Sequence, residues 1–139
     1  MPRLADHLAE RVHARETDKA GRPYVGHPRR VAAKIDDPLG KVVALLHDVL
    51  EDSKVFSESQ LRSWFGDEVV DAVVALTKVH GEAPDDYYER VRQNELARRV
   101  KLADISDNLD PERVALLEPG EADRLHAKYA KALEALSVE

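Results

Sequence analysis

The most unusual stretch of the sequence is an apolar run, residues 42–52, that contains four ionisable side chains: His47, Asp48, Glu51 and Asp52. Such a run predicts a buried helix, on which His47 and Glu51 share one face because they are four residues apart. Asp48 and Asp52 have the same spacing and share the neighbouring face. Burying these groups without partners is costly, and imidazole and carboxylate ligands suit a divalent cation. The run therefore predicts a metal site. The simpler alternative is a solvated helix end or a hydrogen-bonded core histidine.

Two other segments contribute residues of the same kinds. His27 stands before Pro28, which favours a helix start at that point, although a histidine there is more simply a surface residue of a loop. Asp104 and Asn108 are four residues apart in a stretch with several apolar residues and would share one helical face. With the first stretch, these segments supply two imidazoles and two carboxylates that could converge on one cation.

The elements that must position these residues are all predicted to be helices. Apolar residues recur at spacings of three and four, and helix-capping residues such as Asp37 and Ser57 mark the starts. The helices expected are residues 4–15, 28–35, 38–52, 57–65, 67–77, 85–98, 100–109, 111–117 and 122–136. There is no glycine-rich phosphate loop, no alternation of strands with helices and no serine or cysteine nucleophile motif. The predicted fold is an all-α, compact multi-helix bundle.

Composition limits the class of protein. The length of 139 residues suits one domain, residues 1–139, and the absence of cysteine excludes disulfides and thiolate metal sites. The formal net charge of -6 argues against general nucleic-acid binding. No apolar segment approaches the ~20 residues of a membrane span. The first residues lack the apolar core of a secretory signal, so the sequence predicts a cytoplasmic protein without a membrane partner.

The order of the candidate ligands, H…HD…D, resembles the HD superfamily of metal-dependent phosphohydrolases. Longer segments sharpen the likeness, because they resemble the hydrolase domain of the RelA/SpoT family, which includes small stand-alone alarmone hydrolases. These segments are Gly21–Pro28, Ala44–Asp52, Phe65-Gly66, Leu76–Lys78 and Val100–Asp104. The resemblance covers roughly residues 5–135 and implies a helical HD-domain fold.

The resemblance implies one divalent cation per chain, manganese, with four ligands: His27, His47, Asp48 and Asp104. It also implies that Glu51 and Asp52 orient and deprotonate the attacking water, and that Asn108 lies near the substrate ribose. Lys19 is a candidate for a phosphate contact. The implied enzyme is a diphosphoric ester hydrolase. It removes the 3′-pyrophosphate from guanosine tetra- and pentaphosphate, the nucleotide signals of the stringent response.

The sequence departs from the family pattern around the substrate. Asp18 stands where the family usually has arginine, Ile105-Ser106-Asp107-Asn108 replaces Arg-Leu-His-Asn, and Pro111 replaces a threonine. The metal ligands are retained, but parts of the base-recognition pattern are not. Two alternatives therefore stay open: an HD-domain nucleotide phosphohydrolase of other specificity, and a nucleotide-binding module with little catalysis.

Overall fold

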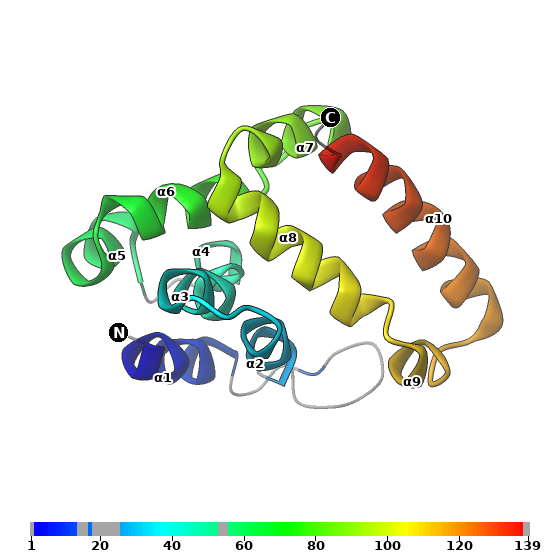
Figure 1. Cartoon of the computed structure of the whole chain (residues 1–139), viewed down its shortest axis with the longest axis horizontal. Coiled ribbons are helices and arrows are strands. Elements are labelled where there is room, and N and C mark those ends of the chain that lie inside the picture. The colour runs from blue at the N-terminus through cyan, green and yellow to red at the C-terminus, as the bar shows by residue number, and fades with distance from the viewer. Residues whose placement is uncertain (1, 14–16, 18–25, 53–55, 138–139) are drawn as a thin grey trace.

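The structure is a computed structural model that describes residues 2–13, 17, 26–52 and 56–137, with Glu51 and Asp52 described by their backbone alone. The regular elements of these residues are helices (Figure 1), which confirms the predicted all-α class. Their bounds are α1 Pro2–His13, α2 Gly26–Ala33, α3 Pro38–Leu46, α4 Val49–Asp52, α5 Glu58–Phe65, α6 Asp67–Leu76, α7 Pro84–Arg92, α8 Glu95–Asn108, α9 Pro111–Val114 and α10 Pro119–Leu136. None of them is long and apolar enough to cross a bilayer.

Helix α3 is the centre of the hydrophobic core. Its residues Val42–Leu46 are all buried, as expected for a helix that is apolar around most of its circumference. It packs against α1, α2, α6 and α8, and Figure 1 shows it between these helices. Full burial of one such side chain contributes about 1.5–3 kcal/mol, so α3 holds together the helices that carry the candidate ligands.

Local side-chain contacts set several helix ends as the sequence predicts. The Asp37 carboxylate accepts a hydrogen bond from the Gly40 amide at 2.9 Å and so caps α3. Ser57 and Gln60 form the expected capping box at the start of α5. Gly66 ends α5 with a φ of 87°, a left-handed conformation that glycine adopts without steric cost.

Two of the predicted helices are broken in the structure. The helix predicted over residues 38–52 is interrupted at His47 and Asp48, which separate α3 from α4. The His47 Nδ1 atom lies 2.5 Å from the Ala44 carbonyl oxygen, so the imidazole replaces a helical backbone donor at the end of α3. The helix predicted over residues 85–98 ends at Arg92, because the Asn94 side chain accepts from the Ala97 amide and caps a new helix, α8.

The first break changes the basis of one prediction. The four-residue spacings of His47 with Glu51 and of Asp48 with Asp52 were expected to fall within one helix, but each pair spans the break between α3 and α4. Three bounds differ by more: α8 begins five residues before the predicted residue 100, α9 ends three residues before the predicted residue 117, and α10 begins three residues before the predicted residue 122. The other differences lie within the one or two residues by which helix ends vary. For example, His27 lies inside the first turn of α2, not at its cap.

Candidate metal centre

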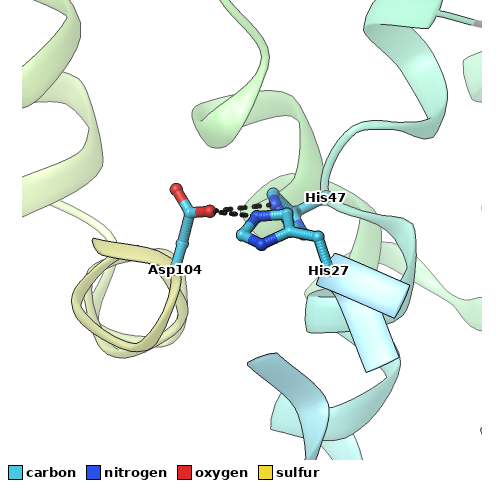
Figure 2. A group of neighbouring side chains, drawn as sticks. All are labelled: His27, His47 and Asp104. Atoms are coloured by element: carbon cyan, nitrogen blue, oxygen red, sulfur yellow. Dashed lines mark hydrogen bonds and ion pairs between the residues drawn. The ribbon is translucent and has the colours of Figure 1, made fainter. Parts of the chain in front are cut away.

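Helices α2 and α8 and the end of α3 bring three of the predicted ligands together (Figure 2). The Nε2 atom of His27 lies 2.6 Å from Oδ1 of Asp104, and Nε2 of His47 lies 3.5 Å from the same oxygen. Each residue offers one ligand atom, and these atoms lie within 4.8 Å of one another. All three side chains are buried. This group could hold a metal ion.

The fourth predicted ligand, Asp48, lies beside this group. Its Oδ2 atom is 3.2 Å from Nε2 of His47, and its side chain is 18% exposed, so it lies at the solvent side of the cluster. The buried Nε2 atom of His47 has no hydrogen-bond partner among the described residues. A cation would satisfy this nitrogen, and two imidazoles with two carboxylates are a suitable donor set for divalent transition metals. The residues present therefore fit a divalent cation.

The hydrogen bonds of the two imidazoles leave the same nitrogen for a cation. In His47, Nδ1 donates to the Ala44 carbonyl, so Nδ1 keeps a proton and Nε2 is the nitrogen that would give up its proton to a cation. In His27, Nδ1 lies 2.6 Å from Oδ2 of Asp107, and Nε2 is directed at Asp104. A second partner that fixes the tautomer in this way is a common feature of metal-binding histidines.

Known proteins with similar sequences cover most of this chain. A guanosine-3′,5′-bis(diphosphate) 3′-pyrophosphohydrolase of Aquifex aeolicus is 33% identical over 113 residues, which are 74% of this chain and 16% of that protein. A protein of Synechocystis named as a probable enzyme of the same kind is 33% identical over 132 residues, 92% of this chain and 16% of its own. A GTP pyrophosphokinase of Streptomyces coelicolor is 36% identical over 127 residues, 86% of this chain and 13% of its own.

This chain thus spans 16% or less of the length of these three relatives. No model of a protein family matches it. A solved structure of a metazoan ortholog of SpoT, described as hydrolysing ppGpp, has the same fold: the TM-score is 0.80 at 24% identity, over 97% of this chain and 84% of the other. The chain is a RelA/SpoT hydrolase-like domain of the HD type.

Electrostatic interactions keep Asp104 of the HD-type domain ionised. Burial alone raises the pKa of Asp104, but the Lys101 ammonium and the two histidines together hold it well below its usual range. The Lys101 Nζ atom lies 2.9 Å from Oδ2 of Asp104. Burial likewise lowers the pKa of His47, and the Asp48 and Asp104 carboxylates outweigh it and raise that pKa to about 9. Without a cation, His47 is therefore protonated at neutral pH.

The other predicted site residues differ in how far the structure describes them. Asn108 lies at the edge of the cluster, where its Nδ2 atom is 3.4 Å from Oδ1 of Asp104 and donates to the Tyr129 hydroxyl at 3.1 Å. Lys19 lies outside the described residues, and so do the side chains of Glu51 and Asp52, whose backbone belongs to α4. Their roles stay predictions.

Three residues without a role predicted from the sequence support His27: Asp107 contacts it, and Arg30 and Arg113 contact Asp107. Asp107 is 1% exposed and accepts from Arg30 Nε at 2.9 Å and from Arg113 Nη1 at 2.8 Å, besides its contact with His27. One sequence signal could have identified it: Asp107 is three residues after Asp104, and two acids at this spacing share one face of α8. The two arginines carry no comparable signal, because their partner is distant in sequence.

We expect the free energy of unfolding of the metal-free HD-type domain to fall as the pH rises from about 6.5 towards about 9. The pKa of His47 is about 9 when folded and 6.5 in its reference state. A raised pKa stabilises the fold fully below the reference value, and this contribution disappears as the pH passes the folded value. Denaturant unfolding in chelator at pH 6, 7.5 and 9 measures the effect.

The control for this pH series is the His47→Gln variant. Glutamine does not titrate, so the free energy of unfolding of this variant should lack the part of the pH dependence that comes from the His47 imidazole. Manganese should raise the melting temperature of the wild type by mass action and release protons as it binds. A metal-free wild type with constant stability over this pH range would contradict the assigned ion pairs of His47.

Proposed function

We propose that this domain, residues 1–139, is a cytoplasmic, manganese-dependent phosphohydrolase that removes the 3′-pyrophosphate of guanosine tetra- and pentaphosphate. The observation that supports this function most is the convergence of His27, His47 and Asp104 from three distant segments into one buried group. The names of the Aquifex and Synechocystis relatives specify this substrate and this bond. A small nucleotide is the partner that we expect, and the net charge of -6 argues against general nucleic-acid binding.

In this proposal four residues hold the cation: His27, His47, Asp48 and Asp104. When bound, such an ion lowers the pKa of a coordinated water and neutralises negative charge on phosphoryl oxygens. Lys101 keeps Asp104 ionised through its 2.9 Å contact, which a cation ligand requires.

The reaction that we propose is the attack of water on the phosphorus next to the ribose 3′ oxygen. The bond between that phosphorus and the 3′ oxygen breaks, and the products are pyrophosphate and GDP or GTP. Glu51 accepts one proton of the water, and Asp52 orients the water beside it. The leaving 3′ oxygen takes up one proton in return and becomes the 3′ hydroxyl of the product. Asn108, which donates to Tyr129, contacts the ribose, and Lys19 contacts a phosphate.

Purified protein with manganese and guanosine tetraphosphate is expected to release pyrophosphate. The same assay with His47→Ala is the control, because this change removes an imidazole ligand and should abolish turnover. Equal rates for the two proteins, or no pyrophosphate from the wild type, would remove guanosine tetraphosphate as the substrate. A panel of nucleoside di- and triphosphates then tests the alternative of a nucleotide phosphohydrolase with other specificity, which the Asp18 and Pro111 departures favour.

The second alternative is a nucleotide-binding module with little catalysis. One observation favours it: the sequence departs from the family's substrate-recognition pattern at Asp18 and Pro111. A thermal-shift titration with manganese and then nucleotide, run beside the turnover assay, separates the two cases. Stabilisation by the nucleotide without product would support the binding module, and stabilisation with product would support the enzyme.

A further inference from the structure

We propose that Asp107 is a positioning residue that fixes His27 as a ligand for the cation. This inference rests on the proposed cation-binding role of His27. The family pattern has a histidine at this place, whereas this chain has an aspartate that is 1% exposed. Its Oδ2 atom lies 2.6 Å from Nδ1 of His27, a residue 80 positions earlier in the chain.

The two nitrogens of His27 are held by two carboxylates of one helix. Asp104 and Asp107 are three residues apart on α8 and share a face, and they lie 2.6 Å from Nε2 and Nδ1 of His27, respectively. Without a cation both nitrogens donate, Nδ1–H to Asp107 and Nε2–H to Asp104. A cation would displace the Nε2 proton, and donation from Nδ1–H to Asp107 would then keep the remaining ring proton on the side away from Asp104. The Nε2 lone pair then points to where Asp104 and His47 offer their own ligand atoms.

Two arginines from different helices hold the Asp107 carboxylate. Arg30, one turn after His27 on α2, donates its Nε–H to Oδ1 at 2.9 Å. Arg113, on α9, donates from Nη1 to Oδ2 at 2.8 Å and to the Asp107 carbonyl at 3.2 Å. Two guanidinium groups favour the ionised carboxylate, and an ionised acceptor forms the stronger hydrogen bond with the imidazole. Asp107 therefore orients the ring and increases the basicity of its other nitrogen.

The test is the Asp107→Asn variant, which keeps the shape of the side chain and removes its charge. We expect the manganese dissociation constant to rise about 10–100-fold, as is typical for loss of a residue that supports a metal ligand. Manganese titration of the full chain, followed by electron paramagnetic resonance of the free ion, measures this constant. The matched control is Asp110→Asn. Asp110 caps α9 by accepting from the Glu112 amide, and asparagine caps equally well, so manganese affinity should not change.

A second measurement needs no variant and so does not depend on folding of Asp107→Asn. In the wild type loaded with diamagnetic zinc, nitrogen-resolved NMR should show the His27 proton on Nδ1, protected from exchange, and the metal on Nε2. A proton on Nε2, a manganese affinity of Asp107→Asn equal to that of the wild type, or a wild type that binds neither ion would each overturn the proposal. Both readouts report metal binding alone, so a chain that binds metal but releases no pyrophosphate counts only against the proposed function.

Discussion

Replacement of Asp104 by alanine is expected to abolish cation binding and pyrophosphate release and to lower the free energy of unfolding by about 3–5 kcal/mol. Asp104 contacts His27, His47 and Lys101. Its removal takes one ligand from the cluster and leaves the Lys101 ammonium buried without its carboxylate. Breaking a buried ion pair on one side is costly for this reason. Metal content, turnover and denaturant unfolding in chelator measure the three losses.

The double variant Asp104→Ala/Lys101→Met separates the loss of metal from the loss of stability. Methionine fills a similar volume as lysine without its charge, so the double variant should recover most of the stability. It should still bind no cation and release no pyrophosphate, because the ligand is missing. Stoichiometric metal in the Asp104→Ala variant would show that Asp104 is not a ligand.

Glu51→Gln is expected to lower kcat by about 10²–10⁴-fold, the usual effect of removing a general base, and to leave the metal content unchanged. Glutamine keeps the shape of the side chain but cannot accept the proton of the attacking water. The measurement is pyrophosphate release beside metal content, for the wild type and the variant at the same protein concentration.

The control for Glu51→Gln is Glu68→Gln. Glu68 is exposed in the first turn of α6, so its substitution should leave turnover unchanged. If Glu51→Gln loses its metal, Glu51 is a ligand and the proposed division of roles is wrong. If the variant keeps both metal and full activity, the base lies elsewhere, and Asp52→Asn tests the next candidate.

The parts of the fold that the sequence predicts well depend on neighbours in the chain. Asp37, Ser57 and Gly66 act on amides or torsions within a few residues, so their types alone indicate where helices begin and end. The break at His47 was not predicted, because the apolar run on both sides is compatible with one long helix. At this break the imidazole of His47 contacts the Ala44 carbonyl, a contact that the pattern of apolar residues does not indicate.

The parts of the site that the sequence could not predict depend on contacts between distant segments. His27, His47 and Asp104 were recognisable as metal-ligand types in the order of a known family. Lys101, in contrast, is indistinguishable in sequence from a solvated surface lysine. Its role follows from its burial against Asp104 and from its position 5.5 Å from the centre of the Tyr87 ring. The place of Asp107 three residues after Asp104 is a sequence signal, but its contact with His27 is not, because that partner is 80 residues away.

The distance along the chain between the candidate ligands has a consequence for the rates of folding. His27 and Asp104 are 77 residues apart, so the cluster exists only after α2, α3 and α8 have docked. Closing such long loops is slow and entropically unfavourable. An ion that recognises only the docked arrangement stabilises the native state but not an earlier transition state. If the cation binds only the native arrangement, it leaves the folding rate nearly unchanged and slows unfolding. The metal-loaded chain would then be kinetically protected against unfolding.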